Sequence, residues 1–234
     1  MLGQLLEISI ATGDVSESLS FFESLGFRSL AVGDTFSHHY AVVTDGTVFI
    51  GLHAKQFDSP ALTYTRTDIA KLVRDFQKNG IEFIFSEIRD DVFNEAHFLS
   101  PEGLLLRLFE ARTFSPPFEY LEPSLCGHFS ELRLPTVDFD ASVDFWESSG
   151  FVCLERADDP EPEAALTSDG LNLGLRDARH VRYPVLVFQH EEMPGRLEAI
   201  RDKGFRPTDV KGHDDVVELR APGGTRLWLC QTEA

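Results

Sequence analysis

The sequence predicts an α+β protein of four βαβββ modules, which pair into two cupped, partly open, barrel-like sheets with the helices outside. Three observations predict this architecture. The chain repeats itself in two halves, each half divides again into two similar quarters, and in each quarter short apolar stretches surround one stretch with helical spacing. One module cannot close a sheet around a core, so two modules are expected to share each cup.

The two halves match in one register over most of the chain. Residues 5–27 read LLEISIATGDVSESLSFFESLGF, and residues 129–151 read FSELRLPTVDFDASVDFWESSGF, at a constant offset of 124. Further along, SPEG at 100–103 corresponds to APGG at 221–224, at an offset of 121. Chance would rarely hold such a match over two hundred residues, so the halves are homologous.

The first quarter shows each element of the module in order. Residues 5–10 alternate apolar and polar side chains, as a half-buried strand does. Asp14 stands where a helix N-cap belongs, and Gly26 ends that helix as a C′ residue. A strand–turn–strand follows over 38–54, with Asp45-Gly46 as its tight turn.

The other quarters repeat this order. In the second quarter, ALTYTRT is a strand, a helix over Ile69–Phe76 stops at Asn79-Gly80, and two more apolar stretches complete the sheet. Pro194 is tolerated in the first turn of the last helix. The predicted division is an N-terminal domain 1–112 (modules 1–57 and 58–112), a Pro-rich linker 113–127, and a C-terminal domain 128–234 (modules 128–181 and 182–234).

Composition narrows the classes of partner. The chain is 42% hydrophobic and 26% charged, as is ordinary for a globular protein. A net charge of −18 opposes binding to nucleic acid or to an anionic membrane. The N-terminus shows no signal peptide or membrane span, and three widely spaced cysteines indicate free thiols in a reducing cytoplasm. Monomer and homodimer both remain open.

Two motifs resemble the vicinal oxygen chelate superfamily, which includes glyoxalase I, bleomycin-resistance proteins and extradiol dioxygenases. The opening motif, a strand followed by D-x-x-x-S-x-x-F-[FYW] and L-G-F, appears as DVSESLSFFESLGF and, less strictly, as DFDASVDFWESSGF. The closing motif, D-P-D-G-x-x-[IL]-E-[LF], is approached by SPEGLLLRLFE and APGGTRLWLCQ. Together they cover nearly the whole chain in order, which makes the resemblance specific at the level of the fold.

The resemblance implies metal-ligand positions on the first and last strands of paired modules. In the first half these positions carry Glu7, Gly51, Ala61 and Arg107; in the second they carry Glu131, Gly174, a residue near Val185, and Trp228. One carboxylate per cup does not hold a divalent cation, and a guanidinium repels one. No metal or other cofactor is therefore expected, and a Glu7–Arg107 salt bridge is predicted where the metal would be.

Histidines are the remaining source of reactivity in the first half. His97, four residues before Pro101, is predicted to line the first cup. His53 lies two residues beyond Gly51 and therefore on the same strand face, so His53, Glu7 and His97 could form a displaced metal set. Of the adjacent His38 and His39, at most one can face the cup. No catalytic residue is assigned.

The second cup is expected to carry Glu131, Glu218, Arg226 or Trp228, and Phe188. Two carboxylates there could serve as a general acid and base. Ordinary ion pairing with Arg133 or Arg220 is the competing interpretation. The residues predicted to line the two cups are thus Glu7, His53, His97, Arg107, Glu131, Glu218 and Trp228.

The leading functional hypothesis is a metal-free protein that sequesters a small molecule, such as a planar or aromatic compound, as in the bleomycin-resistance branch. The alternative is a metal-dependent lyase, isomerase or extradiol-type dioxygenase with displaced ligands. A third is a degenerate partner domain that uses its surface. Fold analogy does not decide among them.

Overall fold

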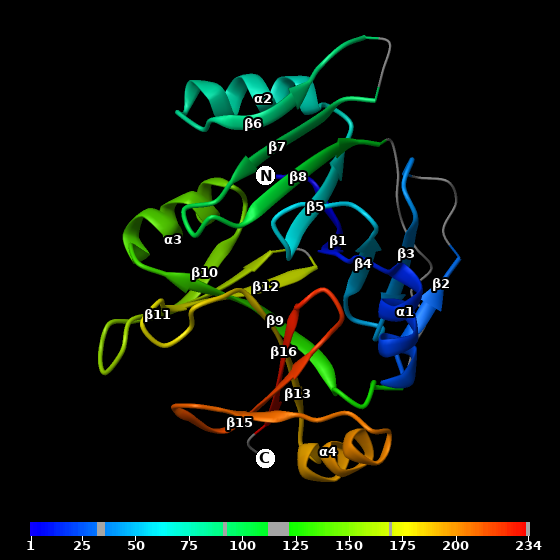
Figure 1. Ribbon diagram of the computed structural model, residues 1–234. Coiled ribbons are helices and arrows are strands. Elements are labelled where there is room, and N and C mark those ends of the chain that lie inside the picture. Colours follow the sequence, from blue (N-terminus) through cyan, green and yellow to red (C-terminus); the bar gives the residue numbers. More distant parts are fainter. Residues whose placement is uncertain (32–35, 91–92, 112–121, 169, 233–234) are drawn as a thin grey trace.

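The computed structural model describes residues 1–31, 36–90, 93–111, 122–168 and 170–232. Within these ranges the chain runs four times through strand, helix and three strands, as Figure 1 shows. The four-module order predicted from the sequence is confirmed.

The elements of the first half are β1 (Gln4–Ala11), α1 (Val15–Ser24), β2 (Arg28–Leu30), β3 (Tyr40–Thr44), β4 (Phe49–His53), β5 (Ala61–Arg66), α2 (Ile69–Lys78), β6 (Phe83–Glu87), β7 (Glu95–Leu99) and β8 (Leu105–Glu110). Those of the second half are β9 (His128–Thr136), α3 (Phe139–Ser148), β10 (Val152–Ala157), β11 (Glu163–Ser168), β12 (Leu171–Asp177), β13 (Val185–His190), α4 (Met193–Asp202), β14 (Thr208–Val210), β15 (His213–Arg220) and β16 (Arg226–Gln231).

Each half forms one open, mixed sheet of eight strands. The strand order is β2-β3-β4-β1-β5-β8-β7-β6 in the first half and β10-β11-β12-β9-β13-β16-β15-β14 in the second. The first strands of paired modules meet at the centre and run antiparallel, while each pairs in parallel with the last strand of its own module. Two modules therefore share each sheet, and neither sheet closes into a barrel, as predicted.

Local signals in the sequence define the helix ends. The Asp14 carboxylate accepts hydrogen bonds from the backbone N–H groups of Ser16 and Glu17, at 2.8 and 3.1 Å, and so caps α1. Gly26 follows the helix with a φ of 91°, a conformation that glycine adopts without strain. Pro194 lies in the first turn of α4, where no N–H is needed.

The Asp45-Gly46 turn connects β3 to β4 and also contacts the second half of the chain. One oxygen of the buried Asp45 accepts hydrogen bonds from the N–H groups of Thr47 and Val48, at 2.8 and 3.0 Å. Its other oxygen accepts from the N–H of Phe129, at 2.8 Å, at the start of the second half. The turn therefore joins the two halves.

The two halves share a continuous core. Phe21 on α1 contacts Phe205 beyond α4 with ring centroids 5.3 Å apart, and Phe27 contacts Phe188 at 5.7 Å. On the other side, Trp146 on α3 donates to Glu102 of the first half at 3.3 Å. In Figure 1, α2 and α4 lie at opposite ends of the molecule, and α1 and α3 lie between them.

Part of the predicted linker can be described. Residues 113–121 lie outside the described residues, whereas Ser124 and Gly127 form an isolated antiparallel bridge. The division into two domains at this segment stays a prediction. Each of the four helices in the described segments has ten residues, and none of them is long and apolar enough to cross a membrane.

Candidate functional site

A single row of residues crosses the first sheet at the predicted site. Strand pairing sets Glu7 on β1 opposite Thr63 on β5, Thr63 beside Arg107 on β8, and Arg107 opposite His97 on β7. Directly paired residues share a face, so these side chains and Ser9 lie on one face of the sheet, here called the first cup. The β5 member of the row is Thr63; Ala61, the residue predicted there, pairs with Ser9 instead.

Glu7 is the centre of a buried hydrogen-bond network. Its side chain is 1% exposed, and Oε1 accepts from Ser9 Oγ at 2.7 Å and contacts His53 Nε2 at 2.6 Å. The Tyr40 hydroxyl donates to Oε2. Burial and the neighbouring Glu7 raise the pKa of Tyr40, which keeps the phenol protonated as a donor. Both carboxylate oxygens are therefore engaged by protein donors.

The network continues to a second histidine. Nδ1 of His53, which is fully buried, lies 2.8 Å from Nε2 of the half-buried His38. Burial lowers the pKa of His38, and the nearby His53, Lys55 and Arg107 lower it further. Glu7, His53 and His38 thus form a hydrogen-bonded chain that leads from the sheet toward its rim.

Gly51 provides the space that Glu7 occupies. A Cβ atom at Gly51 would overlap the Glu7 carboxyl group, and one at Gly174 would overlap Glu131 in the second half. The glycines at two positions that the resemblance assigns to metal ligands therefore accommodate the carboxylates of the neighbouring strands.

The overlap predicts that Gly51→Ala lowers the free energy of unfolding by about 1–3 kcal/mol, because Glu7 must move away from its three partners. Urea denaturation measures the change. Gly195→Ala is the matched control: its Cβ would meet no atom within 4 Å, and in a helix it should stabilise the protein by about 0.5–1 kcal/mol. Equal changes of the same sign would contradict the described packing.

Arg107 is buried among aromatic rings. The side chain is 2% exposed, and its guanidinium carbon lies 4.9, 5.2 and 5.8 Å from the ring centroids of Phe109, Phe57 and Phe36. Its buried Nη1 has no hydrogen-bond partner among the described residues. Burial lowers the pKa of the guanidinium, an effect that Glu95 and Glu7 oppose. The guanidinium therefore contacts the three aromatic rings, and Glu95 and Glu7 stabilise its positive charge electrostatically.

The predicted Glu7–Arg107 salt bridge is wrong. No ion pair within 4.0 Å joins the two side chains, both of which are described. Strand β8 lies two strands from β1 on the β5 side, whereas the Glu7 carboxylate contacts His53 and Tyr40 on the other side, on β4 and β3. Glu7 instead takes its donors from β1, β3 and β4.

His97 lies on the same face of the sheet as Arg107, with which it pairs, but does not join Glu7. Its Nε2 lies 2.6 Å from Glu95 Oε1. Burial alone would raise the pKa of Glu95, but the hydrogen bond and the charges of His97 and Arg107 outweigh it and hold that pKa below its usual value. The histidine that completes the group around Glu7 and His53 is His38.

In the second cup the carboxylates are paired with arginines. Glu131 accepts from Arg133 at 2.7 Å, and Glu218 accepts from Arg220 at 2.7 Å and from Arg226 at 3.0 Å. Trp228 Nε1 also donates to Glu218, at 3.2 Å. The ion-pair interpretation is therefore the one that the structure shows.

Glu131 and Glu218 do not form a catalytic pair. They lie at the ends of a row that runs from Glu131 through Val187 and Trp228 to Glu218, so three strand spacings, about 14 Å, separate their backbones. The prediction that Phe188 lines this cup is wrong. Phe188 is fully buried on the opposite face, against Phe27, because adjacent strand residues point to opposite faces.

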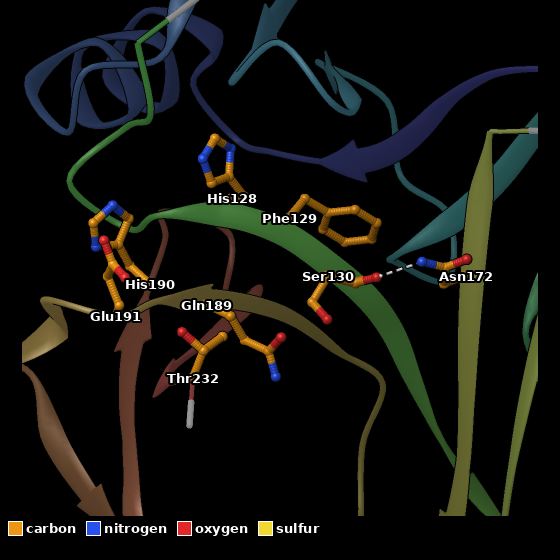
Figure 2. A pocket seen from close by; sticks show the side chains of 8 residues that line it. All are labelled: His128, Phe129, Ser130, Asn172, Gln189, His190, Glu191 and Thr232. Atoms are coloured by element: carbon orange, nitrogen blue, oxygen red, sulfur yellow. Dashed lines mark hydrogen bonds between the residues drawn. The ribbon is translucent and has the colours of Figure 1, made fainter. Parts of the chain in front are cut away.

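A separate groove lies at one end of the second sheet. It has a volume of about 480 Å³ and is lined by His128, Phe129, Ser130, Asn172, Gln189, His190, Glu191 and Thr232 (Figure 2). Asn172 Nδ2 donates to the Ser130 carbonyl at 3.0 Å across its wall. None of the seven predicted site residues lines this groove.

The donor groups of the first cup do not fit a divalent metal. Among the described residues, no group of three or more His, Cys, Asp and Glu side chains could hold such an ion. The Glu7 oxygens already accept three hydrogen bonds, and Arg107 places a buried positive charge at the position of a ligand. Nη1 of Arg107, which has no partner among the described residues, would be satisfied by a hydrogen-bond acceptor and not by a cation.

Known structures share this architecture. The 2,3-dioxygenase LapB from Pseudomonas sp. KL28 is 14% identical with a TM-score of 0.60, over 100% of this chain and 94% of that one. The Mn(II)-bound glyoxalase from Novosphingobium aromaticivorans is 13% identical with a TM-score of 0.60, over 98% and 82%. An extradiol ring-cleaving dioxygenase from B. fuscum is 14% identical with a TM-score of 0.63, over 100% and 72%.

These likenesses define the class of fold: the chain has the fold of the vicinal oxygen chelate superfamily, as the sequence motifs indicated. No protein-family model and no curated protein sequence matches the chain. The likeness extends to the fold and leaves the chemistry to be argued from the residues of the cups.

Several residues of the first cup were not predicted from the sequence. Ser9 and Phe109 lie two residues beyond Glu7 and Arg107, so strand alternation could have placed them on the same face. Tyr40 could have been found as the cross-strand partner of His53. Phe36 and Phe57 lie outside strands, and no periodicity in the sequence indicates where they pack.

Proposed function

We propose that this chain is a metal-free, small-molecule-binding protein whose first cup binds a planar organic anion through Arg107. The observation that carries the proposal is the buried Nη1 of Arg107, which has no hydrogen-bond partner in the described part of the chain. A charged donor without an acceptor costs about 1–3 kcal/mol or more, and an anionic oxygen from a ligand would recover that energy as a charge-assisted hydrogen bond.

The surroundings of Arg107 favour a flat ligand. Phe36, Phe57 and Phe109 surround the guanidinium, and aromatic rings stack well on planar molecules. Phe36 and Phe57 are half-buried and lie outside the strands, so either can turn outward to admit a ligand without breaking strand pairing. The ligand then occupies the place of the displaced phenylalanine ring and contacts Arg107. A cytoplasmic location, proposed with this role, agrees with the three free cysteines.

The test is the binding of 4-acetylbenzoate, a planar aromatic carboxylate, measured by calorimetry and by thermal shift. We expect saturable binding and a rise in Tm with ligand concentration. Arg107→Met should weaken binding about 10- to 100-fold, because a charged hydrogen bond contributes roughly 1.5–3 kcal/mol. The neutral analogue 4-methylacetophenone should bind equally weakly to both proteins.

Arg133→Met is the matched control, since Arg133 lies over the Trp228 ring in the second cup at 5.5 Å. It should bind 4-acetylbenzoate as the unmodified protein does. The proposal is overturned if 4-acetylbenzoate and the related planar carboxylates benzoate and 2-naphthoate all fail to bind, or if Arg107→Met binds 4-acetylbenzoate with unchanged affinity.

A metal-dependent lyase, isomerase or extradiol-type dioxygenase is the alternative proposal. The likeness to a Mn(II)-bound glyoxalase and to ring-cleaving dioxygenases favours it at the level of fold. Elemental analysis of the purified protein discriminates between the two: about one Mn, Fe, Ni or Zn per chain would contradict the metal-free proposal.

A further inference from the structure

We propose that the first cup is also a proton-transfer site, in which His38, supported by His53 and Glu7, is the general base for a metal-free isomerisation of the bound anion. The substrate class is a planar organic acid that carries an enolisable C–H beside a carbonyl group. The inference rests on the proposed binding at Arg107 and adds a reaction to it.

The proposed relay uses one arrangement of protons along the hydrogen-bonded chain, which we assign from its contacts. A carboxylate only accepts, so the bond between Glu7 Oε1 and His53 Nε2, at 2.6 Å, places a proton on His53 Nε2. We assign the next bond so that Nε2–H of His38 donates to Nδ1 of His53, at 2.8 Å. The remaining nitrogen of His38, Nδ1, is therefore the one with a free lone pair. Among the described residues it has no hydrogen-bond partner.

Two hydroxyl groups hold the far end of this chain in place. Ser9 Oγ donates to Glu7 Oε1 at 2.7 Å, and the Tyr40 hydroxyl donates to Oε2. Ser9 is in turn bonded to Thr63 Oγ1, at 2.6 Å. These bonds fix both oxygens of Glu7. Glu7 in turn orients the ring of His53, and the His53 ring orients the hydrogen bond to His38.

His38 and Arg107 face the same aromatic ring. The Phe36 ring centroid lies 5.2 Å from that of His38 and 5.8 Å from the guanidinium carbon of Arg107. One flat molecule that displaces Phe36 can therefore contact both groups. Its anionic end would accept from Arg107 Nη1 and its C–H would approach His38 Nδ1.

The charges around His38 suit a base at neutral pH. Burial lowers its pKa, and His53, Lys55 and Arg107 act in the same direction, while Glu7 opposes them. The ring is therefore unprotonated at pH 7 and can accept a proton. Once it has done so, the negative charge of Glu7 stabilises the cation through His53.

The reaction balances without a further reactant. Nδ1 of His38 takes the proton from the carbon next to the carbonyl group, and the C–H electron pair moves to form the enolate, whose oxygen carries the negative charge. The proton on Nδ1 exchanges with water and returns to the same carbon or to the conjugated one. The net change is isotope exchange or movement of a double bond, with no oxidation.

The duplicated half provides an internal comparison. The strand positions that correspond to Tyr40 and His53 carry Glu163 and Arg176, which pair across the same two strands. These two residues form an ion pair at 3.2 Å rather than a relay. The proposed chemistry is therefore confined to the first cup.

The test is exchange of the acetyl protons of 4-acetylbenzoate for deuterium in D₂O, followed by proton NMR with the full-length protein. We expect the protein to accelerate exchange at least about 100-fold over buffer, as general base catalysis typically does. His38→Gln should lose this acceleration while its Kd for 4-acetylbenzoate stays within about 3-fold. His39→Gln, an exposed neighbour outside the site, should exchange as fast as the unmodified protein.

The positioning roles of His53 and Glu7 are tested by the pH profile. The exchange rate should rise with pH as His38 loses its proton, and then level off. Glu7→Gln removes the charge that favours protonated His38, so the midpoint should move to lower pH and the plateau should fall. Should Glu7→Gln fail to fold, His53→Gln serves the same test of the plateau.

The two proposals fail in different ways. If 4-acetylbenzoate binds in an Arg107-dependent manner but its exchange is not accelerated, or if His38→Gln exchanges as fast as the unmodified protein, the proton-transfer inference is overturned and the binding proposal stands. If binding itself is absent from the calorimetric titration, both fail.

Discussion

Glu7→Ala is expected to lower the free energy of unfolding by about 3–5 kcal/mol, as removal of one partner from a buried charged network does. Glu7 is 1% exposed and His53 is fully buried, so water cannot replace the lost carboxylate freely. The substitution leaves His53 Nε2 and the hydroxyl groups of Ser9 and Tyr40 without their acceptor. Urea denaturation followed by circular dichroism measures the loss.

The internal repeat supplies the control for this experiment. Glu131 lies at the corresponding position of the second half, but its side chain is 14% exposed and pairs with Arg133. Glu131→Ala should therefore cost about 1 kcal/mol or less. Equal losses for the two variants would contradict the view that Glu7 holds a buried network together.

The second large effect is expected for Trp146→Ala, which should lower the free energy of unfolding by about 3–5 kcal/mol. The Trp146 side chain is fully buried, and its ring lies 5.1 Å from Phe145 and 5.0 Å from Phe151. Its indole N–H reaches Glu102 of the other half at 3.3 Å. The substitution removes both core volume and a contact between halves.

Thermal unfolding should show that both halves lose stability together in Trp146→Ala, because they share one core. Phe93→Ala is a suitable control, since Phe93 is 84% exposed and should change stability by less than about 0.5 kcal/mol. A Trp146→Ala protein in which only one of two separate transitions shifts would contradict the continuous core.

The repeat predicted the architecture because the order of strands and helices along the chain recurs with it. Strand, helix and three strands recur four times, and the matched positions Glu7 and Glu131 occupy equivalent places, each over a glycine of the adjacent strand. Arg107 and His97, which the resemblance placed in the first cup, lie in one row with Glu7. A period of two residues specifies the face on which a side chain lies.

Alternation does not specify which side chains on that face meet. The predicted partner of Glu7 was Arg107, yet its carboxylate bonds to His53 on the adjacent β4 and to Tyr40 on β3, which lies as many strands away as β8. The rings that cover Arg107 include Phe36 and Phe57, which lie outside the strands and carry no periodic signal. The composition of the buried network therefore depends on side-chain reach and on loop paths.

The contrast between the halves has a physical consequence for function. In the second cup, Glu131 and Glu218 are neutralised by arginines, and Arg226 also stacks on Tyr183 at 4.3 Å. In the first cup, Nη1 of Arg107 has no acceptor among the described residues, and His38 is bonded to His53 through Nε2. A buried charged donor without an acceptor is a feature that a ligand can complete.

A crystal structure of the protein with 4-acetylbenzoate tests the account most directly. The account predicts the carboxylate within hydrogen-bonding distance of Arg107 Nη1, with Phe36 or Phe57 displaced and the acetyl group turned toward His38. A ligand bound in the groove between His128 and His190, or a metal ion held by Glu7 with Arg107 turned away, would contradict it.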